Sequence, residues 1–364
     1  MPADTKHRGQ PFAGKSLLIT GGTGSLGTVL TRRVLSGEMG APAKVIVFSR
    51  DEAKQHYMRL DYQQRRAATD EVIYHNFERV LEFRIGDVRD YHSVLAAARD
   101  ADVVVNAAAL KQVPTCEYFP FEAVRTNVHG AENLVRAIQE HRLPVQTVVG
   151  VSTDKACKPV NTMGMTKAIQ ERIFVQGNMR APSTRFVCVR YGNVLASRGS
   201  VIPLFHEQIR NGGPVTITTT EMTRFLLSLD DAVDTVFAAI EGAKAGETYV
   251  PRAPAARVVD VAAALIGGRP IRTVVTGIRP GEKVHEIMVS DEEAHRTVAR
   301  GKWYAIRPML PELVPDGAAA EPAALRKEYS SADAVMSREE TEALLRERDL
   351  MVADDEPAEA ELLR

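Results

Sequence analysis

Short apolar runs alternate with amphipathic stretches along the first half of the chain. Each run is bounded by polar or turn residues, as expected for buried strands, and the stretches between runs carry apolar residues at helical spacing. Strands are predicted at residues 16–20, 44–48, 81–85, 102–106, 145–151 and 185–190, with helices ending near residue 35 and spanning 122–141 and 163–175. This alternation predicts an α/β fold with a Rossmann-type, parallel, doubly wound sheet.

The composition is that of an ordinary globular protein, with 45% hydrophobic and 26% charged residues among 364. A chain of this length should form two cooperating lobes. We expect one domain at 15–192, a smaller α/β lobe at 193–315, and a C-terminal helix with an acidic tail at 316–364. A formal net charge of -1 gives no electrostatic reason to expect nucleic acid or an anionic membrane as a partner.

The cysteines and acidic residues argue against a metal site. Cys116, Cys157 and Cys188 are odd in number and lack CxxC spacing, which is typical of a reducing compartment and not of a disulfide scaffold or zinc site. Adjacent Asp230 and Asp231 have no further ligands at suitable spacing and are expected to cap a helix ending near residue 243. Residues 1–14 lack an apolar signal core and no later run could span a bilayer, so we expect a cytoplasmic protein.

A glycine-rich turn follows the first predicted strand. Gly21 permits the tight turn, Gly24 lets the backbone approach a pyrophosphate, and Gly27 allows the helix to pack closely on the strand. The helix that begins here offers unpaired N–H groups and the positive end of its dipole to phosphates. We therefore predict a dinucleotide site that also includes Thr23, Ser25 and Leu26.

The next strand ends supply the rest of this site. Ser49 and Arg50 after the second strand favour the 2′-phosphate of NADP over the ribose hydroxyl of NAD, although a solvated charged loop would look similar. Asp87, followed by Val88, either accepts a hydrogen bond from adenine or caps the next helix. Ala107 and Ala108 are small enough for close approach of the nicotinamide ribose.

Two residues beyond these strand ends have less certain roles. Lys111 is placed to face the substrate, or is a surface lysine. Asn127 lies inside a predicted helix, where asparagine is unfavourable, and we expect it to brace a neighbouring loop.

The segment 152–167 concentrates charged side chains at the end of the fifth predicted strand. Asp154 and Lys155 lie in the loop, and Lys167 lies one helical turn after Met163, so Met163 and Lys167 face the same side. Ligands bind at the carboxyl ends of strands in open α/β sheets. A lysine beside the nicotinamide ribose can donate to its hydroxyls and lower the pKa of nearby acids.

The chain resembles the extended short-chain dehydrogenase/reductase superfamily, and specifically the UDP-N-acetylglucosamine 4,6-dehydratases of polysaccharide biosynthesis. The resemblance covers about 15–298. It is carried by the motifs at 21–27, 49–52, 109–114, 152–156, 190–193, 222–225 and 279–282, which are specific only when taken together. It implies a Rossmann fold that binds NADP at 15–192, with NAD less favoured as cofactor. It also implies a UDP-sugar substrate bound mainly by the lobe at 193–315, and a homo-oligomer.

One position departs from the superfamily pattern. The superfamily carries Tyr-x-x-x-Lys at the catalytic helix, whereas this chain has Met163 in place of the tyrosine, and methionine has no titratable proton. The departure indicates either an inactive protein or a branch of the dehydratases that also has this change. Asp154, Lys155 and Lys167 are present, which favours the branch.

The resemblance also implies a reaction. C4 of the sugar is oxidised, a proton leaves C5, water leaves C6 and the hydride returns to C6, with or without inversion at C5. By analogy Lys155 is the base at C5 and Asp154 the acid at C6, although an Asp–Lys ion pair would oppose both protonation states. Thr153, water or Asp154 could take the C4 hydroxyl proton. The alternative for this pair is a loop salt bridge.

Substrate contacts are expected from the second half of the chain. The resemblance places them at Asn193, Val201, Arg224, Arg279 and Glu282, with Arg224 suited to a diphosphate and Glu282 to ribose hydroxyls. A turn asparagine and surface ion pairs are the structural alternatives. Near the C-terminus, Ser337 and Glu340 have capping-box spacing ahead of a helix.

The function predicted from sequence is a nucleotide-sugar 4,6-dehydratase, a hydro-lyase. A 4-epimerase would share the first oxidation but needs no acid at C6, and an inert NADP-binding scaffold is the remaining alternative. The exact sugar, the nucleotide base, the stereochemistry at C5 and the subunit number do not follow from sequence.

Overall fold

The computed structural model describes residues 9–68, 77–195, 200–314 and 321–352. Its main feature is a sheet of nine strands in the order β13-β14-β9-β6-β5-β4-β1-β2-β3. The strands are β1 (Ser16–Thr20), β2 (Lys44–Ser49), β3 (Leu81–Ile85), β4 (Val103–Asn106), β5 (Thr147–Val151), β6 (Arg185–Val189), β9 (Thr248–Pro251), β13 (Thr297–Arg300) and β14 (Trp303–Ile306).

The first six strands are parallel, which confirms the predicted doubly wound sheet. Strand order reverses between β1 and β4, and such a switch point opens a crevice at the carboxyl ends of the strands. β9 continues the sheet in parallel beside β6. β14 is antiparallel to β9, and β13 is antiparallel to β14. Because β9, β13 and β14 come from beyond residue 192, the two parts of the sequence build one sheet.

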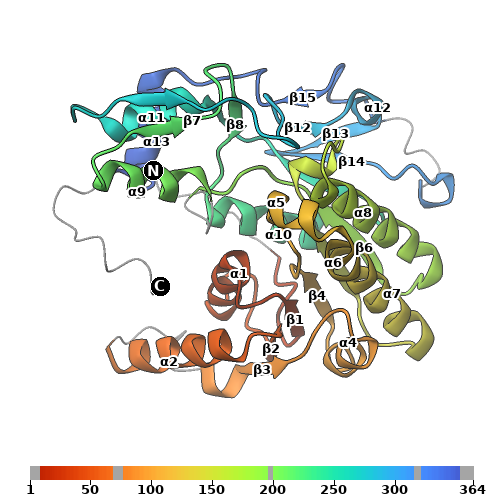
Figure 1. Cartoon of the computed structure of the whole chain (residues 1–364). Helices are drawn as coiled ribbons and strands as arrows, with labels where there is room; N and C mark the ends of the chain where they lie inside the picture. Colours follow the sequence, from red (N-terminus) through yellow and green to blue (C-terminus); the bar gives the residue numbers. More distant parts are fainter. Residues whose placement is uncertain (1–8, 69–76, 196–199, 315–320, 353–364) are drawn as a thin grey trace.

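Helices cover both faces of this sheet (Figure 1). They bury two apolar clusters, one on each side of the strands. The helices of this layer are α1 (Ser25–Leu35), α2 (Glu52–Ala68), α4 (Tyr91–Ala98), α5 (Val113–Tyr118), α6 (Pro120–Ala123), η1 (Val124–His129), α7 (Gly130–His141), η2 (Asp154–Ala156), α8 (Thr162–Arg180) and α10 (Leu229–Gly242).

A smaller lobe lies beyond the carboxyl ends of the parallel strands and has its own apolar cluster (Figure 1). Its elements are α9 (Val201–Arg210), β7 (Val215–Ile217), β8 (Thr223–Phe225), β10 (Ala255–Arg257), α11 (Val258–Ile266), β11 (Thr273–Val275), β12 (Ile287–Val289), α12 (Asp291–Ala294), β15 (Tyr329–Ser330) and α13 (Arg338–Glu347). The short helix η3 (Pro311–Leu313) lies instead beside Gly246, just before β9. The strands pair two by two, as β10 with β8, β11 with β7, and β12 with β15.

Two helix predictions need correction. The span predicted as one helix at 122–141 is divided into α6, the π-helix η1 and α7, and the wider turn of η1 inserts an extra residue into the helical repeat. Of the two aspartates predicted to cap α10, Asp230 does not do so. Ser228 is the N-cap, and Asp231 completes a capping box by accepting a hydrogen bond from the Ser228 N–H. The capping box predicted at Ser337 and Glu340 is confirmed at α13.

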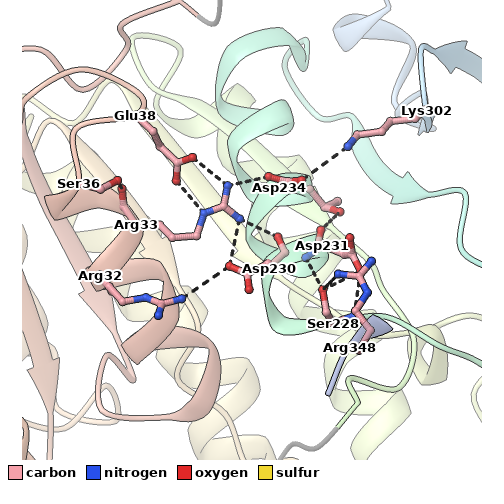
Figure 2. Close-up of polar contacts among 11 residues, drawn as sticks. Arg32, Arg33, Ser36, Glu38, Ser228, Asp230, Asp231, Asp234, Lys302 and Arg348 are labelled. Carbon is pink, nitrogen blue, oxygen red and sulfur yellow. Dashed lines mark hydrogen bonds and ion pairs between the residues drawn. The ribbon is translucent and has the colours of Figure 1, made fainter. Parts of the chain in front are cut away.

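Charged side chains tie α1 to α10 (Figure 2). The guanidinium of Arg33 donates to the Asp230 carbonyl at 2.9 Å and to the Asp234 carboxylate at 2.8 Å. Asp234 also lies 3.6 Å from the Lys302 ammonium, next to β14. This network connects two neighbouring helices that pack against the same apolar cluster of the sheet.

Candidate active site

A cavity of about 790 Å³ lies between the sheet and the small lobe. Its walls come from the carboxyl ends of β1, β2, β4 and β5 and from loops of the small lobe. The predicted site residues along it are Gly21, Thr23, Gly24, Ser25, Leu26, Gly27, Ser49, Arg50, Asp87, Val88, Ala107, Ala108, Lys111, Thr153, Asp154, Lys155, Met163, Lys167, Asn193, Arg224, Arg279 and Glu282. The fold therefore brings together nearly all of the residues singled out from sequence.

Val201 is the exception. It begins α9 and packs against the apolar cluster of the small lobe, whereas the preceding Ser200 lines the cavity. The Val201 side chain thus packs toward the core of the small lobe, and its substrate contact stays a prediction.

The glycine turn fits a pyrophosphate. Gly21 has φ +66°, and a β-carbon there would lie 2.8 Å from the Ala108 backbone. A β-carbon on Gly27 would lie 2.5 Å from Gly22, so the helix can pack on the turn only without a side chain. Gly24 caps α1 with no side-chain hydrogen bond, which leaves the first N–H groups of the helix available to an anion.

The part of the cavity after β2 and β3 carries one positive and one negative side chain. The Arg50 guanidinium is largely exposed and lies 3.9 Å from an Asp87 carboxylate oxygen. Asp87 accepts hydrogen bonds from the backbone and side chain of Arg89, while Asp90 caps α4, so Asp87 does not cap that helix. Burial would raise the pKa of Asp87, but the hydrogen bonds from Arg89 outweigh it and hold that pKa below its usual value.

The structure confirms that Asn127 braces a neighbouring loop, as predicted. Its amide accepts from the Leu110 N–H at 2.9 Å and donates to the Leu110 carbonyl at 3.0 Å, which fixes the loop after β4. It also donates to the Thr166 hydroxyl on α8. The neighbouring Thr126 lines the cavity with a buried hydroxyl that has no protein partner, so it can hydrogen-bond a bound molecule.

The loop that follows β5 carries the predicted Asp154–Lys155 pair. Asp154 is fully buried, and its Oδ1 atom accepts hydrogen bonds from the Thr153 hydroxyl at 2.8 Å and the Lys155 ammonium at 3.1 Å. The Oδ2 atom of Asp154 is buried without a protein partner. The predicted pair therefore does form an ion pair, yet one carboxylate oxygen is left for another ligand.

Lys155 has a second carboxylate beside it. The Glu286 Oε1 atom lies 3.1 Å from the Lys155 Nζ atom, and Glu286 is only 2% exposed. Burial alone would lower the pKa of Lys155, but Asp154 and Glu286 outweigh it and raise that pKa above its ordinary value. Sequence reasoning missed Glu286, which lies four residues after the Arg279–Glu282 motif and carries no local signal of its own.

Lys167 projects from α8 into the same cavity. It donates to the Val151 carbonyl and to the Gln170 amide oxygen, and burial lowers its pKa to about 8. Met163 lies on the same side of α8, as predicted, and packs with Cys116 and Ala123. The methionine thus fills the tyrosine position with an apolar side chain.

Residues of the small lobe form the far wall. The two terminal nitrogens of Arg224 donate to the carbonyls of Thr223, Lys283 and Val284, so this side chain anchors the loop 279–286. Arg279 is exposed on that loop, and Glu282 has one buried carboxylate oxygen without a partner. The Asn193 side-chain oxygen is also buried and unpartnered. These groups can accept a ligand rich in hydroxyl and phosphate groups.

A buried charge network contacts the loop after β5 through Ser152. Arg190 lies between Glu171 and Glu293, at 2.6 and 2.8 Å, and Glu171 accepts from the Ser152 hydroxyl. Burial would raise the pKa of Glu293, but Arg190 outweighs it and lowers that pKa to about 2. The network connects α8, the end of β6 and α12 to the loop after β5.

Within the described ranges, no group of three or more His, Cys, Asp or Glu side chains could hold a metal ion. In the same part of the chain, none of the helices is long and apolar enough to cross a membrane.

Known proteins resemble most of this chain. A family described as polysaccharide biosynthesis protein matches residues 17–308. A UDP-N-acetylglucosamine 4,6-dehydratase (inverting) from Campylobacter jejuni is 42% identical over 302 residues, covering 82% of this chain and 84% of the relative. A UDP-glucose 4-epimerase from Rickettsia typhi is 44% identical over 300 residues, covering 81% and 83%. The solved structure of Pen from Bacillus thuringiensis has a TM-score of 0.82 at 32% identity, over 93% of this chain and 99% of that one.

Proposed function

The chain belongs to the polysaccharide biosynthesis protein family, and from this premise we propose that it is a UDP-N-acetylglucosamine 4,6-dehydratase. The observation that carries the proposal is the buried Asp154–Lys155 pair in the cavity, with one oxygen of Asp154 unpartnered. Removal of water from C5 and C6 needs both an acid and a base at adjacent carbons, and this pair supplies the two groups. The product would be a UDP-4-keto-6-deoxy-N-acetylhexosamine.

The cofactor that suits the cavity is a nicotinamide dinucleotide, with NADP favoured. The glycine turn and the uncapped start of α1 would accept the pyrophosphate, and Arg50 on the cavity wall supports a 2′-phosphate. A bound nicotinamide would supply the hydride acceptor for C4 of the sugar and the hydride donor for C6. Lys167 and Thr126 would hold the nicotinamide ribose, because both are buried polar groups along this part of the cavity.

Asp154 is the proposed acceptor of the C4 hydroxyl proton, a role that Met163 cannot fill. Its Oδ2 atom is an open acceptor, whereas the Thr153 hydroxyl already donates its proton to Asp154. The proton that Asp154 takes from the C4 hydroxyl is then given to the departing C6 hydroxyl, which leaves as water. Lys155 removes the C5 proton and returns a proton to C5, so each residue ends the cycle in its starting state.

A 4-epimerase is the second candidate, because the Rickettsia typhi relative carries that name. An epimerase returns the hydride to C4 and keeps the C6 hydroxyl. It would leave the Asp154–Lys155 pair without an elimination to perform, and this makes the dehydratase the better fit to the site.

The test is to incubate the protein with NADP and UDP-N-acetylglucosamine deuterated at C4. We expect a product lighter by one water with deuterium at C6. A product of unchanged mass with altered configuration at C4 would instead support the epimerase. No turnover of this or related UDP-sugars would support an inert scaffold.

A further inference from the structure

We propose that Glu286 is a positioning residue that takes a proton from Lys155 and thereby makes that lysine a competent base. The inference rests on the proposed dehydratase function and adds to it a residue from the small lobe. It begins from a conflict in the site: a lysine that removes the C5 proton must first be neutral, yet this lysine is held between two carboxylates.

The two carboxylates are not equivalent. Asp154 has its own proton to carry, from the C4 hydroxyl to the C6 hydroxyl, and cannot store a second one. Glu286 contacts the same ammonium, with its Oε1 atom 3.1 Å from Nζ and its Oε2 atom buried without a partner. It is the acceptor that remains for the lysine proton.

The position of Glu286 is fixed by the backbone. Its N–H donates to the Ser331 hydroxyl at 3.0 Å, and its carbonyl accepts from the Ser331 N–H at 2.8 Å. The Ser331 hydroxyl in turn hydrogen-bonds the Thr223 hydroxyl of β8. Segments from three parts of the small lobe therefore hold one carboxylate against the catalytic lysine.

Other charges face Lys155 from neighbouring elements. The Arg224 side chain of β8 lies 3.8 Å from Glu286 and disfavours the charged form of Lys155, and Lys283 on the 279–286 loop interacts with the same cluster. These cations favour loss of the lysine proton, while Asp154 and Glu286 favour its retention. The carboxylates outweigh the cations and keep Lys155 charged in the resting site, so the lysine must first pass its proton to a neighbouring carboxylate.

The proposed transfer conserves protons and electrons. The N–H bond of the Lys155 ammonium breaks, its electron pair stays on Nζ, and a new O–H bond forms on Glu286. Neutral Lys155 then takes the C5 proton and later gives one back to C5. After product formation Glu286 returns its proton to Lys155.

The test compares Glu286→Gln with the wild type in single turnovers with NADP and UDP-N-acetylglucosamine. Glutamine keeps the size of the side chain and can still hydrogen-bond Lys155, but it cannot accept the proton. We expect reduced nicotinamide to form at a rate within about threefold of wild type, while exchange of the C5 hydrogen with deuterated water and release of product slow by about 10²-fold. The residual rate should rise with pH, because the lysine must then lose its proton to solvent.

Glu286→Asp is the second variant, and Glu247→Gln is the control. Aspartate keeps a carboxylate and should restore part of the C5 exchange, whereas Glu247 is a buried carboxylate outside the cavity whose change should affect neither step. A Glu286→Gln protein with wild-type C5 exchange and pH profile would overturn the proposal, as would equal slowing of nicotinamide reduction and C5 exchange. If Glu286→Gln does not fold, C5 exchange in Glu286→Asp as slow as in Lys155→Met would overturn it.

These outcomes are separate from failure of the proposed function. If the wild-type protein itself forms no dehydrated product, the dehydratase assignment fails. If the wild type dehydrates its substrate normally and Glu286→Gln does so equally, only the role of Glu286 fails.

Discussion

The α-carbon of Gly164 packs directly on the carbonyl oxygen of Lys155, and a β-carbon at position 164 would lie 2.2 Å from that oxygen. Gly164 is in the first turn of α8, and its N–H donates to the Asn161 side chain that caps the helix. The loop that carries Lys155 can therefore approach α8 this closely only because residue 164 lacks a side chain.

Gly164→Ala is expected to displace the Lys155 backbone and reduce dehydration by about 10²-fold or more, since small misplacements of catalytic groups are costly. The measurement is kcat, together with the thermal unfolding midpoint. Gly268→Ala is the matched control, because nothing lies within 4 Å of a β-carbon there. Equal activity of the two variants would contradict the packing argument.

Asp154→Asn and Lys155→Met should each lower kcat by about 10²–10⁴-fold but stop the reaction at different stages. If Asp154 takes the C4 hydroxyl proton, Asp154→Asn forms no reduced nicotinamide in a single turnover. Lys155→Met should still form it and then accumulate it, because only C5 deprotonation is blocked. Absorbance of the reduced nicotinamide distinguishes the two variants. If Asp154→Asn forms reduced nicotinamide readily, Thr153 or water accepts the C4 hydroxyl proton instead.

Arg50→Ala should weaken binding of NADP(H) by about 10–100-fold and leave NAD(H) nearly unaffected. A hydrogen bond to a charged group is worth about 1.5–3 kcal/mol, and only NADP carries the 2′-phosphate. Dissociation constants for both cofactors measure the effect, with Lys44→Ala as a control for a lysine outside the cavity. A similar loss for both cofactors would argue against the NADP assignment.

Lys167 should make stability depend on pH in a defined direction. Its pKa is about 8 in the folded protein and near 10.5 when unfolded, so between these values the unfolded chain binds more protons. The free energy of unfolding of the cofactor-free wild type, relative to Lys167→Met, should therefore increase by roughly 3 kcal/mol as pH rises through this window. A difference that does not vary with pH would show that Lys167 is not buried as described.

Glu293 should contribute stability that disappears in acid. Arg190 holds its pKa at about 2, below the ordinary 4.5, so the contribution is present above pH 4.5 and is lost as pH falls toward 2. We expect Glu293→Gln to be less stable than wild type by roughly 3 kcal/mol near neutral pH, with the gap closing in acid. Chemical denaturation at several pH values measures this. Glu342→Gln, on the surface of α13, should show little difference at any pH.

The sequence by itself determined the sheet, the glycine turn and the catalytic segment. These features are local: a strand, a turn and a helix follow one another along the chain, and the residue types that each needs leave a short pattern. Asn127 was also predictable, because an asparagine inside a helix is unfavourable unless its side chain has another partner, here the backbone of Leu110.

Only the tertiary structure decided which charges meet. The pairing of Glu286 with Lys155 and the use of Arg224 to anchor the 279–286 loop join segments far apart in the sequence. The same is true of Arg190 between Glu171 and Glu293. Such contacts leave no periodic or local pattern because they depend on how the small lobe packs over the sheet. That packing raises the pKa of Lys155, since a buried charge responds most strongly to the charges placed beside it.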